Sequence, residues 1–223
     1  SSRPAGVGGR VTTDAFEFVD VSDRVRCPLP ILGAGPAAGK VTLPPESVRT
    51  TVATRRQRWA VETMAVAPHD RVLEIGCGRG AAVSLVAERL TTGTIVAIDR
   101  SATMVRLATE RNADHVRAGR AQIRRAAFES AELPERHFTK IFAVNVNLFW
   151  LGAEAAQIDR MTTLLAPGGA LYVFGERPES ASPTAIVTSV EGLLRAHGFA
   201  TATTVARSGA GRVLTCVAGT PVR

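Results

Sequence analysis

The sequence predicts an α/β fold, with a mostly parallel seven-stranded sheet, helices on both faces of the sheet and a C-terminal antiparallel hairpin. Two observations lead to this fold class. From about residue 70 onward, short apolar runs alternate with segments of helical periodicity, a pattern typical of parallel sheets covered by helices. The last two apolar runs are joined only by the segment SGAG at 208–211, which suits a hairpin.

The strands are expected where a short apolar run is bounded by glycine or polar residues. The run at 71–75 ends in glycines, and the run at 169–175 follows a proline–glycine turn. Runs of this kind, with helical segments on either side in the sequence, indicate strands that are buried on both faces. By the same criterion, further strands are predicted at 94–99, 121–128, 140–146, 199–207 and 213–218.

The helices are expected where helical periodicity follows a capping residue. Ser101 is the predicted N-cap of a helix at 102–112. Ser182 is the predicted N-cap of another helix, with Pro183 in its first position, and Gly198 ends that helix. Further helices are predicted at 47–65, 81–90 and 153–165.

Residues 1–46 differ from the rest of the chain. They are rich in glycine and proline, and they contain one alternating stretch, at 16–21, that suits a short strand. Their few apolar side chains cannot form a core of their own. We therefore expect an N-terminal extension or lid at 1–46, followed by one domain at 47–223.

The charge of the chain is strongly positive, with a net charge of +7 and a pI near 10.5. Such a balance is typical of proteins that bind nucleic acids. However, Lys40 and Lys140 are the only lysines among 27 basic residues, which indicates a coding bias toward arginine. The densest arginine stretch, 100–125, falls mainly on a predicted helix, and aromatic residues make up only 5% of the chain. A solvated helix face is therefore favoured over a nucleic-acid surface.

The cysteine content and hydropathy indicate a reduced, cytoplasmic protein. Cys27, Cys77 and Cys216 are an odd number, far apart and without a CxxC pair, so neither disulfides nor a metal site is expected. No apolar run approaches the roughly 18 residues that a membrane-spanning helix needs, so a membrane protein is excluded. No secretory signal peptide is expected at the N-terminus.

The most informative segment is VLEIGCGRG at 72–80, where a strand runs into three alternate glycines and then into a helix. Such glycines let the backbone approach a ligand closely, and the helix offers free N–H groups. Asp99 ends the next strand, where it suits ribose hydroxyls. Dinucleotide sites have the spacing GxGxxG, whereas this pattern is ExGxGxG. Glu74 would repel a pyrophosphate but suits a ligand that carries a cationic amine or sulfonium.

This pattern resembles that of the class I S-adenosylmethionine-dependent methyltransferases, in particular the small-molecule subset that includes quinone-biosynthesis enzymes. IDRSATM at 98–104 is similar to the family's DxSxxM stretch, ESAELP at 129–134 to its DAxxLP stretch, and LAPGG at 165–169 to its LxPGG turn. The resemblance covers residues 70–220. It implies a Rossmann-like fold, methyltransferase activity and S-adenosyl-L-methionine as cofactor. The cofactor-binding residues that it implies are Glu74, Gly76, Cys77, Gly78, Gly80, Asp99, Arg100, Met104, Glu129, Ser130 and Asn145.

The segment expected to contact the substrate differs from that of family members that methylate nucleic acids or proteins. NVNLFW at 145–150 lacks the NPP-aromatic signature of many enzymes that methylate amino groups of DNA or protein, so a small-molecule acceptor is favoured. Asn147, Phe149 and Trp150 are candidate substrate-binding residues, because they follow the end of a strand. Glu176, just after the fifth strand, is the candidate base or substrate anchor. Phe128, where the family commonly has glycine, is expected to narrow the adenine side.

Three alternatives stay open at this point. The positive charge leaves room for an RNA methyltransferase, and the absence of an evident base leaves room for a domain that binds the cofactor without transferring a methyl group. The third is that the chain forms a homodimer, since nothing in the sequence decides the oligomeric state.

Overall fold

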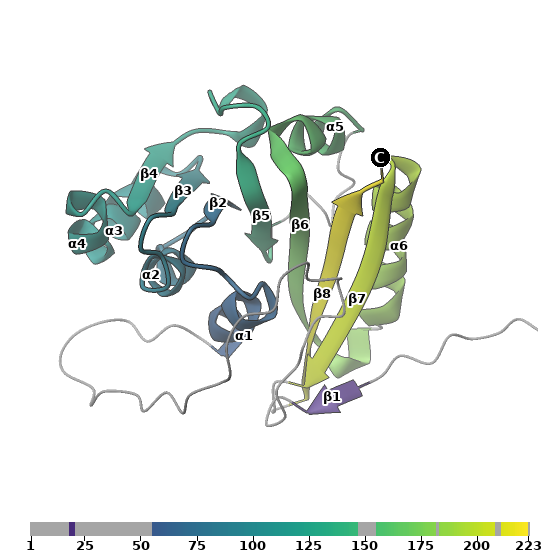
Figure 1. Cartoon of the computed structure of the whole chain (residues 1–223). Coiled ribbons are helices and arrows are strands. Elements are labelled where there is room, and N and C mark those ends of the chain that lie inside the picture. The colour runs from purple at the N-terminus through teal and green to yellow at the C-terminus, as the bar shows by residue number, and fades with distance from the viewer. Residues whose placement is uncertain (1–17, 21–54, 147–154, 182, 208–210, 223) are drawn as a thin grey trace, which may run out of the picture.

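The structure, a computed structural model of the chain, describes residues 18–20, 55–146, 155–181, 183–207 and 211–222. Within these residues, one sheet has the strand order β1-β7-β8-β6-β5-β2-β3-β4 (Figure 1). β8 runs antiparallel to both of its neighbours, and the other pairings are parallel. The strands are β1 (Phe18–Asp20), β2 (Arg71–Ile75), β3 (Thr94–Asp99), β4 (Ala121–Arg125), β5 (Phe138–Val144), β6 (Leu165–Pro178), β7 (Phe199–Arg207) and β8 (Arg212–Pro221).

The predicted fold class is confirmed. β2 to β8 are the seven predicted strands, and β7 and β8 form the C-terminal antiparallel hairpin. β1 falls in the alternating stretch at 16–21 and adds three residues to the edge of the sheet. It pairs in parallel with the last residues of β7, so that Phe18 lies opposite Val205 and Asp20 opposite Arg207.

Helices cover both faces of the sheet (Figure 1). One core cluster contains side chains of α1 and α2, such as Trp59 and Val83. The other contains side chains of α5 and α6, such as Ile158 and Val190. Val72 of β2 belongs to the first cluster, whereas Leu73 and Ile75 belong to the second, so both faces of this strand are buried. The helices are α1 (Arg55–Thr63), α2 (Ala81–Ala87), α3 (Ala102–Arg111), α4 (Ala113–Arg117), α5 (Ala155–Leu164) and α6 (Pro183–Ala196).

Two strand ends differ from the prediction. The strand predicted at 121–128 ends at Arg125, because the chain makes one further hydrogen bond to β3, from the amide of Ala126 to the carbonyl of Asp99, and then enters a 3-10 turn at Phe128–Ser130. The apolar Phe128 is buried in the core, which is why it had extended the strand pattern. The strand predicted at 140–146 stops at Val144, since the following Asn145 has a φ of 55°.

Other bounds also shift. β6 is longer than the predicted 169–175, because β8 pairs with it from Leu171 to Pro178. α2 ends at Ala87 rather than at residue 90, and α3 ends at Arg111. Gly198, with a φ of 77°, follows α6 as predicted. Residues 47–54 and 153–154 of two predicted helices lie outside the described residues, as does the predicted N-cap Ser182.

The parallel strands bring their carboxyl ends to one edge of the sheet, and α1 lies at this edge (Figure 1). Arg56 of α1 forms an ion pair of 2.7 Å with Glu176 near the end of β6. One turn further along, the ring of Trp59 packs edge-on against Phe174, with 5.6 Å between ring centroids. The fold therefore places a charged helix end beside the strand ends, where ligands bind in open α/β sheets.

Candidate functional site

The glycine turn between β2 and α2 has the backbone geometry that its sequence predicts. Gly76, Gly78 and Gly80 have φ values of 73°, 52° and 72°, all in the left-handed region that favours glycine. A Cβ on Gly76 would lie 2.7 Å from Cγ2 of Val146, and a Cβ on Gly80 would lie 2.6 Å from Nδ2 of Asn112. A Cβ on Gly78 would meet no atom within 4 Å. The outer two glycines are therefore needed for close packing, whereas the middle one leaves open space for a ligand.

Asp99 joins this turn to the start of α3. Its Oδ2 accepts a hydrogen bond of 2.9 Å from the amide of Gly78, and its Oδ1 accepts one of 2.9 Å from the amide of Ser101. Each carboxylate oxygen can accept a further hydrogen bond, so Asp99 can hold the two loops and still bind a diol. The predicted N-cap is confirmed, since Ser101 Oγ accepts from the amide of Met104 at 3.4 Å.

Glu74 is a buried carboxyl group beneath the turn, with 3% of its surface exposed. Burial raises the pKa of Glu74 to about 8, and the negative charge of Asp99 contributes to that rise. Its Oε2 is buried and has no hydrogen-bond partner among the residues that the structure describes. This oxygen can still accept a hydrogen bond, and a cationic ligand nearby would favour the ionised form of the Glu74 carboxyl group.

Replacing Glu74 by glutamine should change the pH dependence of stability in the ligand-free protein. Because the pKa of Glu74 is raised on folding, its contribution to stability is present below about pH 4.5 and is lost as the pH rises through about 8. The variant is neutral throughout. Its free energy of unfolding, relative to that of the natural chain, should therefore rise between pH 5 and pH 8.5. Denaturant unfolding at both pH values measures this, and a difference that stays constant would contradict the account.

Cys77, inside the turn, suits a packing role. Its side chain is buried, and burial together with the charges of Glu74 and Asp99 raises the pKa of the thiol. A reactive thiolate is therefore disfavoured, even though α2 begins only a few residues later. Its place in the predicted cofactor set thus concerns the backbone of the turn.

Asn112 is a functional candidate that the sequence did not reveal. It is fully buried, and its Nδ2 donates to the carbonyls of Gly80, at 3.0 Å, and of Ala108, at 2.8 Å. Its Oδ1 accepts from Ser84 Oγ at 2.8 Å. This amide holds the end of the glycine turn between α2 and α3. Asparagine after a helix is common at helix ends, so the sequence offered no signal for this role.

Two predicted residues at the start of the next loop and helix lie close to Asp99 in the chain. Arg100 follows it directly and is exposed, whereas Met104 is half-buried in the first turn of α3. Both extend the surface beside the glycine turn toward α3.

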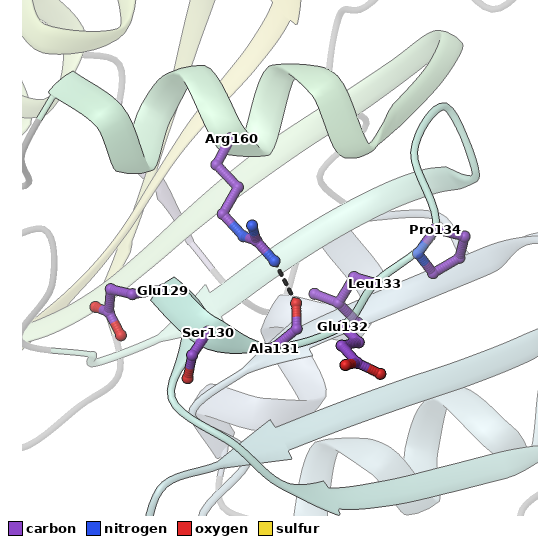
Figure 2. A pocket seen from close by; sticks show the side chains of 7 residues that line it. All are labelled: Glu129, Ser130, Ala131, Glu132, Leu133, Pro134 and Arg160. Carbon is purple, nitrogen blue, oxygen red and sulfur yellow. Dashed lines mark hydrogen bonds between the residues drawn. The ribbon is translucent and has the colours of Figure 1, made fainter.

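Glu129 and Ser130 line an open pocket of about 610 Å³ at the end of β4 (Figure 2). Gln157 of α5 donates to Oε1 of Glu129 at 2.8 Å, and Nη2 of Arg160 donates to the carbonyl of Ala131. The pocket is lined by Glu129, Ser130, Ala131, Glu132, Leu133, Pro134 and Arg160, so no residue of the glycine turn is part of its lining. Phe128 does not line this pocket. Its ring packs in the core beneath Arg160, whose guanidinium carbon lies 5.5 Å from the ring centroid.

Asn145 and Glu176 connect the ends of β5 and β6. Asn145 Oδ1 accepts from the amide of Glu176 at 2.8 Å. The carboxylate of Glu176 is 15% exposed, and it pairs with Nη1 of Arg56 at 2.7 Å through Oε2 and with Nε of Arg212 at 3.1 Å through Oε1. A carboxylate that bridges two guanidinium groups is better suited to positioning than to accepting a proton.

The remaining predictions concern residues of the loop after β5 and metal or membrane sites. Asn147, Phe149 and Trp150 lie outside the described residues. Among the described residues, no group of three His, Cys, Asp or Glu side chains could hold a metal ion. No helix in the described part of the chain has the length and apolar character needed to cross a bilayer.

The arginines at 100–125 largely have local partners. Arg106 pairs with Glu110 at 2.6 Å on exposed α3, and Arg117 pairs with Asp114 at 2.7 Å on exposed α4. Such pairing favours the solvated face predicted for this stretch.

Comparisons with known proteins agree with this geometry. Residues 72–169 match the sequence-family model of a methyltransferase domain. The trans-aconitate 2-methyltransferase of Methylobacterium radiotolerans is 34% identical over 137 residues, which are 58% of this chain and 47% of that enzyme. The enzyme of that name from Delftia acidovorans is 35% identical over 124 residues, 54% of this chain and 44% of that enzyme. This chain thus spans about half the length of these relatives.

Solved structures share the fold. A SAM-dependent methyltransferase from Aquifex aeolicus has a TM-score of 0.61 at 16% identity, covering 74% of this chain and 89% of that one. The [4+2]-cyclase SpnF also has a TM-score of 0.61 at 16% identity, covering 76% and 82%. At such low identity these likenesses establish the architecture alone.

Proposed function

We propose that the chain is a class I S-adenosylmethionine-dependent methyltransferase that transfers the methyl group of this cofactor to a small-molecule acceptor; its residues 72–169 match the family model of a methyltransferase domain. One observation carries the proposal. The glycine turn leaves open space at Gly78 beside Asp99, and the charge of Asp99 acts on Glu74, a buried acid with an oxygen that has no partner among the described residues. This cradle at Gly78, with Asp99 beside it and the buried acid Glu74 close to Asp99, suits a ligand with both a diol and a cationic end.

The described residues fit such a cofactor. Asp99 would bind the ribose hydroxyls, while Glu74 and the backbone of the turn at 76–80 would face the cationic end. Glu129 and Ser130, beside the open pocket, would border the adenine. Arg100, Met104 and Asn145 complete the predicted set around this cradle, as residues that follow Asp99 and end β5.

The cofactor supplies an activated methyl group, and the protein supplies position and exclusion of water. The reaction is an in-line displacement, in which an acceptor atom must approach the methyl group from the side opposite the sulfur. We expect α1 and the ends of β5 and β6 to border this approach, because they lie at the carboxyl edge of the sheet. Asn145 fixes the end of β5 to the backbone of Glu176, so this border is held by hydrogen bonds.

A small acid is the acceptor that the relatives favour, because enzymes similar to part of this chain are named for trans-aconitate. The RNA alternative gains no support from these relatives. The alternative without methyl transfer has a structural parallel, since the [4+2]-cyclase SpnF shares the fold.

A labelled-methyl assay tests the proposal. The full chain is incubated with S-adenosylmethionine carrying a labelled methyl group, together with a panel of small organic acids and, separately, structured RNA at low and physiological salt. We expect label in an organic acid. Label only in RNA that persists at physiological salt would favour the RNA alternative, because non-specific arginine binding weakens with salt. Cofactor binding without any transfer would support the non-catalytic alternative.

We also propose that residues 47–223 form the methyltransferase domain and that residues 1–46 extend over its acceptor side. Support comes from β1 and α1, the two described segments that come before and after residues 21–54. β1 ends beside Arg207, the last residue of β7, and α1 begins next to Glu176. β7 and β6 both run toward the carboxyl edge, so the chain is anchored at that edge on both sides.

A further inference from the structure

The cluster formed by Arg56, Glu176 and Arg212 has a geometry that the methyl-transfer proposal leaves unused. It joins three separate elements, α1, β6 and β8, at the carboxyl edge of the sheet. Two guanidinium groups share one carboxylate, so the cluster carries a net positive charge. The exposed fractions of the side chains are 23% for Arg56, 15% for Glu176 and 42% for Arg212.

The cluster keeps hydrogen-bonding capacity for an anion. A guanidinium group has five N–H donors in a planar fork. The described contacts of Arg56 use one of them, on Nη1, and its buried Nε has no partner among the described residues. Arg212 binds Glu176 through Nε, which leaves its terminal nitrogens out of that contact. Arginine forks of this kind match the two oxygens of a carboxylate.

The position of the cluster relates it to the glycine turn. The backbone amide of Glu176 donates a hydrogen bond to Oδ1 of Asn145, and Val146, which follows Asn145, packs against Gly76. β2, β5 and β6 are neighbours in the sheet, so the cluster lies two strands, or about 10 Å, along the edge from the turn. A small molecule beside the turn could therefore place one end on the cluster.

We propose that the Arg56–Glu176–Arg212 cluster binds a carboxylate of the acceptor, which is a di- or tricarboxylic acid. This inference rests on the proposed methyl transfer. Arg56 and Arg212 bind the carboxylate, and Glu176 is a positioning residue that holds both guanidinium groups. A second carboxylate of the same acid accepts the methyl group: an O–C bond forms, the C–S bond breaks with its electron pair staying on sulfur, and no proton moves.

This chemistry accounts for the pairing of Glu176. An acceptor carboxylate is already ionised at neutral pH, so its methylation needs no general base. A glutamate that bridges two arginines is then more useful as a fixed counter-charge than as a proton acceptor. The anchor also sets specificity, since an acid with a single carboxylate cannot bind the cluster and react at once.

The test compares the natural chain with Arg56→Gln, with trans-aconitate as the probe. Calorimetry gives the affinity for trans-aconitate with and without S-adenosylhomocysteine, and labelled transfer gives kcat and KM. We expect Arg56→Gln to weaken trans-aconitate binding and raise KM by about tenfold or more, with a smaller change in kcat and in S-adenosylhomocysteine affinity. Arg56→Lys, which keeps the charge, should recover part of the affinity.

Matched variants separate this role from a structural one. Arg106→Gln removes the same charge from exposed α3 and should leave trans-aconitate affinity unchanged. Arg212→Gln changes an exposed side chain on β8 and should also raise KM. It replaces Arg56→Gln as the test variant if Arg56→Gln does not fold. Equal affinity for trans-aconitate in the natural chain and in a folded Arg56→Gln or Arg212→Gln, or no binding to the natural chain, would overturn the inference. If the natural chain does not bind S-adenosylhomocysteine, the proposed function is overturned instead. The affinity for trans-aconitate measured without S-adenosylhomocysteine then still tests whether the cluster binds a carboxylate.

Discussion

Replacing Asp99 by alanine is expected to weaken the binding of S-adenosylhomocysteine by about 1–3 kcal/mol. The variant loses the acceptor for ribose hydroxyls, and it also loses the two hydrogen bonds that hold the amides of Gly78 and Ser101. Asp99→Asn keeps one acceptor oxygen and should have an intermediate affinity. Calorimetry with S-adenosylhomocysteine measures each of these affinities.

The exposed Asp114 offers a matched control for this variant. Asp114→Ala removes the same charge, in a pair with Arg117 on the surface, and should leave the affinity unchanged. Unfolding curves show whether each variant is folded. An unaltered affinity in folded Asp99→Ala would remove Asp99 from the cofactor site.

Removing residues 1–45 is expected to lower methyl transfer by about 100-fold or more, through lost exclusion of water and lost positioning of the acceptor. Affinity for S-adenosylhomocysteine should stay within about tenfold, because the glycine turn, Asp99 and Glu129 all remain. The measurement compares turnover and cofactor affinity in the truncated and full chains.

A shorter deletion, of residues 1–17, is the control for this truncation. It retains β1 and its pairing with β7, so it shows whether that anchor preserves the effect of the segment. Normal turnover after removal of residues 1–45 would show that the segment does not cover the acceptor side.

The sequence predicted the elements that depend on local patterns. The strand at Arg71–Ile75, the glycine turn and the cap at Ser101 are encoded within a few neighbouring residues. Strand ends were less accurate where contacts with distant residues decide them. The buried Phe128 looked like part of a strand, and the pairing with β8 lengthened β6 beyond its own apolar run.

The candidate site was predictable only where a motif marks it. The acid before the glycine turn and the acid that ends β3 are both close to the turn, as the spacing indicated. The partners of Glu176 could not be predicted, since Arg56 and Arg212 lie 120 and 36 residues away from it in the chain. Asn112 reaches Gly80 across 32 residues, and no periodicity reveals such a contact.

The central claim is that the cradle at Gly78 holds S-adenosylmethionine and not a dinucleotide. Calorimetry of the full chain with S-adenosylmethionine, S-adenosylhomocysteine and NAD tests it most directly. Asp99 beside the turn suits a ribose and repels a pyrophosphate, and burial raises the pKa of Glu74, so that Glu74 becomes ionised beside a cationic ligand and not beside an anionic one. We therefore expect binding of the first two ligands and none of NAD. Tight binding of NAD without binding of S-adenosylhomocysteine would contradict the account.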